Sequence, residues 1–468
     1  MEPMPSALLL GFLLAVPQLK TDAEKAAELI ESAERLASKG EYHAAYQKYL
    51  TAMARYPETD GGRTATRRIG QPSGYLGCAD MERAGPSANR VDVVVMGDGY
   101  MREEQESFDR LARYVPDLFR QHPVLGEYYG YHNFIRCNLF SAESGVGGYG
   151  REKDTALRAA ASGLSSGQVA VDGSRVHRWL AELPEHDGLV CVFVPSGSHG
   201  TGGGGIATLG GRPDQVVYHE WGHAFAGLAD EYDDDVGYTG PPGEAPNLAT
   251  TDDPKKVPWR HWLDVRGTEV GIHRGGGGRV RGTWKPSVRG CAMNAGRDYC
   301  PVCREQIVLN LYRYVDPIDA VVPDAHPYAR PEAGAKDGIL RGDKPHELGV
   351  TVLQPKSHEL EVRWWVLPAE QAPPPPAGAG EKSRSERGPL APLEDKPAAQ
   401  SRRNGKGEHA FKMRPDEFEP GLYRVVCRVR DTTEMSGDRL PWVLKDDGGL
   451  LESECGWWVL VEPELRGR

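Results

Sequence analysis

Two histidines that flank a glutamate are the residues best suited to chemistry in this chain. They lie in the segment HEWGH at residues 219–223. In an α-helix, residues four apart lie on one face, so His219 and His223 can both reach a single ion. Glu220 then points toward a water bound to that ion, where it could take the proton of the water and return it to a leaving amine. The pattern is typical of zinc hydrolases and predicts one catalytic Zn²⁺ ion, with Glu220 as the general base.

The neighbouring residues predict that HEWGH lies on a helix that ends soon after it. Apolar residues continue a helical stripe through Phe225 and Leu228. Gly227 can adopt the left-handed backbone conformation that ends many helices. The competing interpretation is an amphipathic helix with two surface histidines, followed by a solvated acidic run from Asp230 to Asp235.

A tetrahedral catalytic zinc site needs one more protein ligand besides the attacking water. Asp230 is the first acid after the predicted turn at Gly227, and its short side chain suits a close approach. Glu231 is the second candidate, and His261 and His273 are distant alternatives. If Asp230 is the ligand, Glu231 projects to the other side of an extended chain, where it could accept the second N–H of a zinc-binding histidine.

Length, charge and cysteine content exclude several classes of protein. A chain of 468 residues suggests two to four domains. Its net charge of −11 is spread along the sequence, so nothing indicates a nucleic-acid partner. Eight cysteines are too few for a disulfide scaffold. No apolar stretch reaches the ~18 residues that indicate a transmembrane helix.

Residues 1–20 contain a signal-like hydrophobic segment, ALLLGFLLAV at residues 7–16. Its length suits the apolar part of a signal peptide, although Glu2 stands where a positive charge is expected and no clear cleavage site follows. The alternative is a short helix that packs against the protein. We expect export, which would make the protein secreted, periplasmic or part of the cell envelope.

Residues 90–316 have the mixture of strands and helices expected of an α/β unit. Apolar runs predict buried strands at residues 91–96 and 189–194. Residues 206–209 are typical of a short strand at a sheet edge, where an extended substrate could pair. The glycine-rich segment 199–205 is not a phosphate-binding loop, because no Lys-Ser/Thr pair follows it.

Different segments flank this unit. Residues 21–60 predict a helical hairpin with the spacing of one tetratricopeptide-type repeat, and residues 61–89, rich in Gly, Pro and Arg, predict a linker. Residues 345–465 carry strand signals that predict an immunoglobulin-like β-sandwich, interrupted by a disordered insert at 373–407. We expect the sandwich to fold alone and, together with the hairpin, to dock the protein to a surface or a partner.

Several motifs resemble those of the M64 peptidases, a family named for an immunoglobulin A peptidase. They are VVVMGDGY at 93–100, ESGV at 143–146, HEWGHAFAGLADEY at 219–232, and Cys291-x-Met293 followed by YCPVC at 299–303. This resemblance covers roughly residues 90–316 and implies a metzincin-like zinc endopeptidase. It implies a twisted sheet, an active-site helix at the floor of a cleft, and Met293 in a turn below the zinc. In the broader metzincin pattern, the helix-ending glycine and the third ligand each stand one residue earlier than Gly227 and Asp230 do here.

Three interpretations of Cys291, Cys300 and Cys303 remain open. They could bind a structural zinc ion, but no fourth Cys or His stands at a suitable spacing. In an exported protein, a disulfide that ties the Met293 turn to the following helix is favoured. Redox catalysis by the Cys300–Cys303 pair would need a thioredoxin-like context, which the surrounding sequence does not provide.

The sequence favours a zinc endopeptidase that acts on protein or peptide substrates. The alternative, from another class, is a catalytically degenerate metallopeptidase that serves as a cell-surface binding or adhesion protein. The presence of Glu220 favours catalysis, because a binding protein does not need a general base. Tyr232 and Tyr299 are further candidates to polarise an oxyanion near the metal, although a buried tyrosine with a satisfied hydroxyl is the commoner case.

Overall fold

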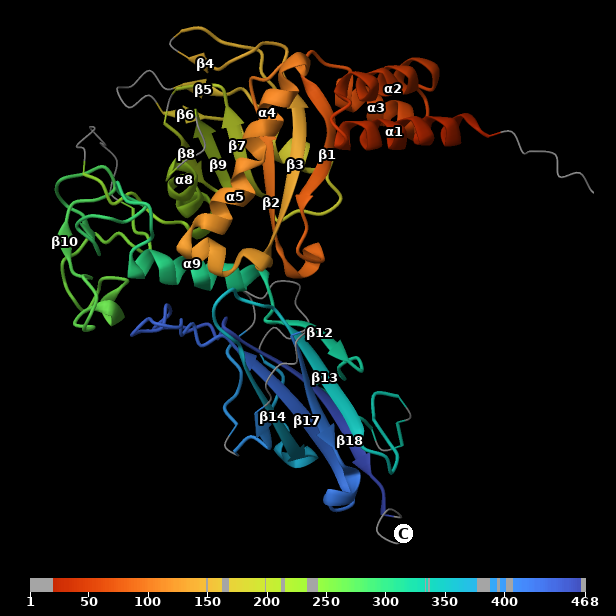
Figure 1. The fold of residues 1–468 in the computed structure, drawn as a ribbon, viewed down its shortest axis with the longest axis vertical. Helices are drawn as coiled ribbons and strands as arrows, with labels where there is room; N and C mark the ends of the chain where they lie inside the picture. Colours follow the sequence, from red (N-terminus) through yellow and green to blue (C-terminus); the bar gives the residue numbers. More distant parts are fainter. Residues whose placement is uncertain are drawn as a thin grey trace, which may run out of the picture.

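A mixed six-stranded sheet lies at the centre of the larger part of the molecule, with helices packed against it (Figure 1). The computed structural model describes residues 20–463 except 149, 162–167, 198, 212–214, 234–242, 333, 336, 377–387, 394–395 and 401–406. The signal-like segment predicted at residues 1–20 lies, apart from Lys20, outside the described residues. Within the described part of the chain, no helix has the length and apolar character needed to cross a membrane.

The strands of the central sheet occur in the order β1-β3-β2-β7-β9-β8. Their bounds are β1 Gly74–Glu82, β2 Val91–Gly97, β3 His132–Phe140, β7 Leu189–Val194, β8 Thr201–Gly203 and β9 Ile206–Gly210. The inner strands are parallel, whereas β1 and β8 are antiparallel to their neighbours. The strands predicted at residues 91–96 and 189–194 are β2 and β7. The strand predicted at 206–209 is β9, but its expected place at the sheet edge is wrong, because β8 pairs along its outer side.

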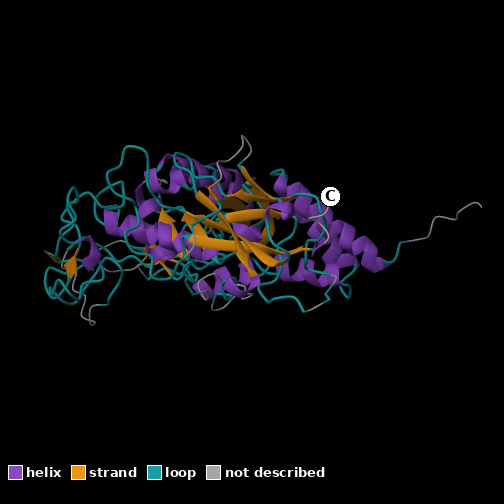
Figure 2. Ribbon diagram, turned by 90° about the horizontal axis from the view of Figure 1, so that it is seen from below, coloured by secondary structure: helices purple, strands orange, loops and turns teal. Residues whose placement is uncertain are grey.

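Helices pack on both faces of this sheet, and Figure 2 shows helices around the strands of the molecule. The helices are α4 Gln105–Ala112, α5 Tyr114–Gln121, α6 Pro123–Glu127, α7 Gly173–Leu180, α8 Gln215–Ala226 and α9 Pro301–Tyr314. Val93 and Val95 of β2 lie in one core with α4, α5, α8 and α9, while Val94 and Met96 lie in a second core with α7. Every residue of β2 and β7 is buried, which explains why these strands are continuous apolar runs in the sequence. Short strands outside this sheet are β4 Gly147–Gly148, β5 Ala160–Ala161, β6 Val169–Ala170, β10 His273–Arg274 and β11 Trp284–Lys285.

Three helices near the N-terminus pack beside β1. They are α1 Asp22–Ser38, α2 Tyr42–Arg55 and α3 Asp60–Ile69. The helical hairpin predicted at residues 21–60 corresponds to α1 and α2. Its apolar face packs against α3, Leu76 of β1 and Phe140 of β3, so this chain itself covers the face that a lone repeat would leave exposed.

The linker predicted at residues 61–89 is wrong, because this range contains most of α3 and all of β1. Gly61 shows one reason: a Cβ at this position would lie 2.8 Å from the Cβ of Ala26, so glycine allows α3 to approach α1 closely. Arg68 is buried, and its guanidinium pairs with Glu34 at 2.7 Å and Glu182 at 2.9 Å. The glycines and arginines of this segment therefore serve packing rather than flexibility.

Two antiparallel sheets form the C-terminal part of the molecule (Figure 1). One contains β12 Ile318–Val322, β13 His346–Val352 and β16 Glu408–Met413. The other contains β14 Glu361–Pro368, β15 Ala399–Gln400, β17 Gly421–Arg430 and β18 Glu452–Val461. Val350, Trp364 and Trp457 lie in one core that both sheets share. This arrangement begins at Ile318, earlier than the predicted residue 345, and its immunoglobulin-like character stays a prediction.

Part of the disordered insert predicted at residues 373–407 is ordered. Strand β15 pairs with Arg363 and Trp364 of β14. The guanidinium of Arg428 also donates to the carbonyl of Ala391 at 2.6 Å. The sequence does not reveal this pairing, since a strand of two residues is too short to show a period. The rest of the prediction falls largely on residues 377–387, 394–395 and 401–406, which lie outside the described residues.

The C-terminal part shares a core with the helices of the central sheet, and α9 lies between the two parts (Figure 1). Leu353 and Trp442 belong to the same buried cluster as α6 and α9. His358 lies between two carboxylates: its Nδ1 is 2.8 Å from Glu127 Oε1, and its Nε2 is 2.8 Å from Asp431 Oδ1. These contacts argue against the expectation that the C-terminal part folds alone.

We expect His358→Gln to lower the free energy of unfolding by ~3–5 kcal/mol, as for other buried ion pairs that lose one partner. The His358 side chain is only 4% exposed. Burial lowers the pKa of His358, but the hydrogen bonds and charges of Asp431 and Glu127 outweigh that effect and raise the pKa above its usual value.

The sign of the pH dependence follows from this raised pKa. The stabilisation is complete below the unfolded-state pKa of ~6.5 and is lost as the pH rises through the folded-state pKa. Denaturant unfolding of both proteins at about pH 6 and about pH 9 should therefore show a smaller difference at the higher pH. If the two proteins differed equally in unfolding free energy at both pH values, His358 would not be charged in the folded protein.

Candidate metal centre

Helix α8 turns its apolar side toward the core and its histidines toward the opposite side. Val217, Trp221 and Phe225 are buried in the core between the sheet and its helices. His219 and His223 remain partly exposed, with 18% and 15% of their side chains accessible. Because they stand four residues apart on one helix, their rings lie side by side, with centroids 4.7 Å apart.

The chain turns back after α8 and brings Asp230 to the histidines. The helix ends at Ala226, and Gly227 has φ +62°, a left-handed conformation that glycine adopts without strain. Asn247 is buried and holds the returning segment. Its Oδ1 accepts from the N–H of Ala229 and its Nδ2 donates to the carbonyl of Ala229, both at 2.8 Å. Asn247 could not be predicted from the sequence, because no local motif links it to the HEWGH segment.

His219, His223 and Asp230 bring three possible ligand atoms together. His219 Nε2 and His223 Nε2 each lie 3.0 Å from Asp230 Oδ1, and the two nitrogens are 3.1 Å apart. These distances approach the ~3.3 Å edges of a tetrahedral zinc site with bonds of ~2.0 Å. The three side chains that the sequence singled out as ligands are therefore adjacent in the fold.

Backbone carbonyls hold the other ring nitrogen of each histidine. His219 Nδ1 lies 2.8 Å from the carbonyl oxygen of Ala292, and His223 Nδ1 lies 2.5 Å from that of Leu228. A carbonyl oxygen can only accept, so each Nδ1 carries a proton. If both imidazoles are neutral, the Nε2 atom of each ring carries a lone pair, and these two lone pairs point toward each other and toward Asp230. Three acceptors in this arrangement need a positive charge between them, either a metal ion or a proton.

The two histidines favour the ionised form of the Asp230 side chain over the protonated form. Burial raises the pKa of Asp230, but hydrogen bonds that His219 and His223 donate in their protonated forms hold that pKa well below its usual range. Burial lowers the pKa of His219, but the hydrogen bond and charge of Asp230 outweigh that effect and raise the pKa to about 9. Protons therefore compete with a metal ion for the histidines, and metal affinity should fall as the pH falls.

Glu220 lies next to this group in a space that glycines leave open. A Cβ on Gly200, just before β8, would lie 2.9 Å from Glu220 Oε1, and a Cβ on Gly202 would lie 2.7 Å from the Cβ of His223. These glycines therefore allow β8 to lie close against α8, a role that their sequence neighbours do not indicate. Burial raises the pKa of Glu220 to about 7, while the charges of His219 and His223 act in the opposite direction.

A turn that contains Met293 lies beneath α8, as the family resemblance leads us to expect. A Cβ on Gly222 would lie 2.5 Å from Met293 Sδ, so the sulfur packs directly against the helix. The carbonyl of Met293 accepts a hydrogen bond from the N–H of Glu231 at 2.6 Å. The turn thus contacts both the helix with the histidines and the segment with Asp230.

Several other candidate residues do not join the group of three. Glu231 does project away from Asp230, but both histidine Nδ1 atoms bond to carbonyls, so it is not their partner. His261 Nε2 instead lies 2.6 Å from a carboxylate of α9. His273 lies in β10 and is not part of the group of three. The hydroxyl of Tyr299 donates to a backbone carbonyl of α8 at 2.6 Å, which removes it as an oxyanion donor.

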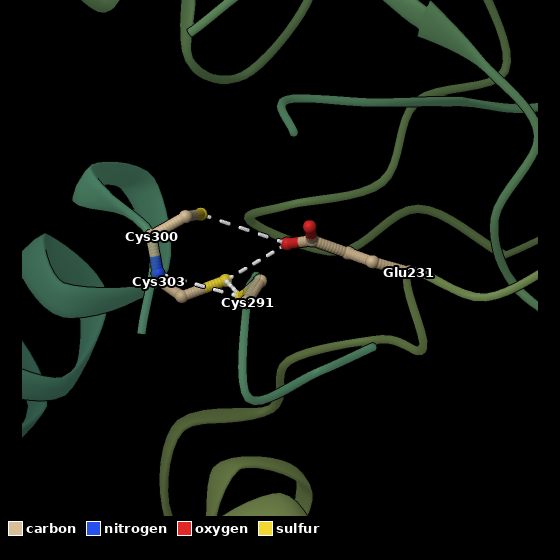
Figure 3. A group of neighbouring side chains, drawn as sticks. All are labelled: Glu231, Cys291, Cys300 and Cys303. Atoms are coloured by element: carbon tan, nitrogen blue, oxygen red, sulfur yellow. Dashed lines mark hydrogen bonds between the residues drawn. The ribbon is translucent and has the colours of Figure 1, made fainter. Parts of the chain in front are cut away.

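The favoured disulfide among the nearby cysteines is also wrong. Cys291, Cys300 and Cys303 are free thiols, and the sulfurs of Cys291 and Cys303 are 3.7 Å apart (Figure 3). The carboxylate of Glu231 faces them: its Oε1 lies 3.1 Å from Cys303 Sγ and 3.7 Å from Cys300 Sγ. The sequence alone does not link Glu231 to the cysteines, because it stands about 60 residues before Cys291 and is neither a Cys nor a His.

Comparison with known proteins gives one family. Residues 79–267 match the model of the family described as IgA Peptidase M64. This range includes most of the central sheet, α8 and Asp230, whereas Met293 and the three cysteines lie beyond it. No curated protein matches the chain. Residues 79–267 of this chain are therefore similar to the M64 peptidases, a family of metallopeptidases.

Proposed function

We propose that this protein is a zinc-dependent endopeptidase that cleaves peptide bonds in protein substrates. In this proposal His219, His223 and Asp230 bind the zinc ion, and Glu220 is the general base. One observation carries the proposal: three acceptor atoms converge with separations of 3.0–3.1 Å on the face of α8 that also bears Glu220.

The chemistry divides between the ion and Glu220. When bound, zinc supplies Lewis acidity that acidifies a coordinated water and polarises the carbonyl of the scissile bond. Three protein ligands leave a fourth position open, as hydrolytic sites require. Glu220 takes the proton as the water oxygen forms its bond to the carbonyl carbon, and then delivers it to the nitrogen as the C–N bond breaks. The amine therefore leaves in neutral form.

Features beside the site support a protein substrate. In the described part of the chain, β8 is the outer strand of the central sheet, and its Gly202 lies against Glu220 and His223. We propose that an extended peptide lies along this strand, since main-chain hydrogen bonds suit substrates of varied sequence. The ring of Tyr232 stacks on His219 with centroids 6.0 Å apart. We propose that its hydroxyl polarises the carbonyl oxygen under attack.

We expect the purified full-length protein to cleave an unfolded protein such as reduced casein. The proposed side-chain ligands bind the metal reversibly, so the chelator 1,10-phenanthroline should remove it and stop cleavage. Added Zn²⁺ should restore cleavage. Gel electrophoresis and mass spectrometry of the fragments would measure both effects.

The competing function is binding without catalysis. In that case the protein would retain zinc but release no fragments from casein at any enzyme concentration. Full cleavage by a metal-free preparation would instead refute zinc dependence. The protein would then be a peptidase that uses another mechanism.

A further inference from the structure

We propose a second metal site in this protein, in which Cys291, Cys300, Cys303 and Glu231 bind a structural zinc ion (Figure 3). The four side chains come from three segments that are distant in the sequence. Glu231 follows α8, Cys291 begins the turn that contains Met293, and Cys300 and Cys303 lie at the start of α9. This site is separate from the proposed catalytic centre and does not depend on the peptidase activity.

The distances among the ligand atoms suit a tetrahedral zinc ion. One ligand atom from each of the four residues lies within 4.8 Å of all the others. The sulfurs of Cys291 and Cys303 are 3.7 Å apart, and Glu231 Oε1 lies 3.1 Å and 3.7 Å from the sulfurs of Cys303 and Cys300. A tetrahedral ion with Zn–S bonds of ~2.3 Å and a Zn–O bond of ~2.0 Å requires edges of ~3.5–3.8 Å.

The donor set selects zinc and a structural role. Three thiolates favour a soft or borderline ion such as Zn²⁺ over Ca²⁺ or Mg²⁺. Four protein ligands close the coordination sphere, as in structural zinc sites, and leave no position for a substrate. The two residues between Cys300 and Cys303 match the spacing of many such sites. The N–H of Cys300 also donates to Cys291 Sγ at 3.4 Å, a contact that stabilises a thiolate.

Hydrogen bonds already orient the carboxylate of Glu231 toward the sulfurs. Its side chain is fully buried, and Asn247 Nδ2 donates to Oε1 at 3.0 Å, while Ser287 donates to Oε2. Outer partners of this kind are typical of metal-binding carboxylates. A disulfide would use only two of the three sulfurs and would leave the buried carboxylate facing them without a cation.

A metal ion at this place would fix the parts that build the proposed catalytic centre. Glu231 adjoins Asp230, and Cys291 adjoins Ala292, whose carbonyl holds His219. Asn247 joins the two sites, because it binds both Ala229 and the carboxylate of Glu231. The second ion therefore holds Asp230 and helix α8 in position and takes no part in the reaction.

The test begins with zinc content and X-ray absorption of the full-length protein, purified without chelators. We expect two zinc ions per chain in the wild type and one in the double variant His219→Ala/His223→Ala, which lacks the proposed catalytic site. The zinc that remains in the double variant should have about three sulfur neighbours at ~2.3 Å. A double variant without zinc, or with zinc bound only by nitrogen and oxygen, would overturn the proposal.

Substitutions at the cluster give an independent measurement. Cys303→Ser should lose one zinc ion per chain, whereas the control Cys455→Ser, at a cysteine of β18, should keep two. If Cys303→Ser does not fold, the double variant still decides the question through its absorption spectrum. Alkylation of the unreduced wild type and mass spectrometry provide a further check, because a disulfide between any two of the three cysteines would refute the site.

Discussion

Replacing Glu220 with glutamine is expected to lower kcat for peptide hydrolysis by about 10²–10⁴-fold while zinc content stays unchanged. Glutamine has nearly the same shape but cannot accept the proton of the attacking water. The residue is 5% exposed and does not belong to the group of possible ligands, so the substitution should not disturb the metal. Initial rates on a fluorogenic peptide and zinc analysis of the same preparation would measure both quantities.

The pH profile separates a base from a structural residue. A general base must be deprotonated, so kcat/KM should rise with pH through the pKa of Glu220 in the wild type and lose this limb in Glu220→Gln. Burial raises that pKa to about 7, and a nearby divalent cation would lower it again. Glu106→Gln, on the exposed side of α4, is a matched control and should keep wild-type kcat. A Glu220→Gln enzyme with most of its kcat would show that another group activates the water.

Asp230→Ala is expected to remove one zinc ion per chain and nearly all peptidase activity. Its Oδ1 lies 3.0 Å from the Nε2 atoms of both His219 and His223, so the substitution leaves two ligands where an open hydrolytic site needs three. Zinc affinity should fall by more than ~10–100-fold, which is the usual loss when the removed residue only orients a metal ligand. Equilibrium dialysis against zinc would give the affinity.

Asp233→Ala provides the control for Asp230→Ala. Asp233 stands three residues later on the same segment, is half-exposed, and pairs with Lys285 at 3.1 Å rather than with a histidine. We expect this variant to keep its zinc and most of its activity. If Asp230→Ala kept both its zinc and its activity, Asp230 would not be a ligand, and the third ligand would have to come from elsewhere.

The sequence could predict the site wherever short-range geometry determines it. His219, Glu220 and His223 stand on one helix, so their relative positions follow from the helical repeat. Asp230 follows Gly227 closely enough for a single turn to bring it back. Buried strands such as β2 and β7 were also predictable, since both of their faces are covered and their sequences are continuous apolar runs.

The contacts that support the site could not be predicted, because they are long-range or use the backbone. The carbonyls of Ala292 and Leu228 that orient the histidines have no signature in the sequence, since every residue carries a carbonyl. Asn247 and Glu231 become important only after the chain folds back on itself. Composition was misleading for α3 and β1, where glycine and arginine, common in linkers, instead permit close packing and bury an ion pair.

Long-range contacts also join the C-terminal part to the rest of the molecule. Its strands were recognisable, but the sequence gives no sign that Trp442 enters the core beside α9 or that His358 bridges Glu127 and Asp431. These contacts join residues more than 200 positions apart in the case of His358 and Glu127. The C-terminal sheets therefore help to support the helices that pack on the central sheet.

The most direct test of the proposed function is an anomalous-difference map at the zinc absorption edge from crystals of the wild-type protein. The map should show a peak between His219 Nε2, His223 Nε2 and Asp230 Oδ1, at ~2.0–2.2 Å from each atom, beside the carboxylate of Glu220. Zinc-containing crystals without a peak there would contradict the proposed catalytic centre. A peak there with Asp230 turned away from the ion would contradict its role as the third ligand.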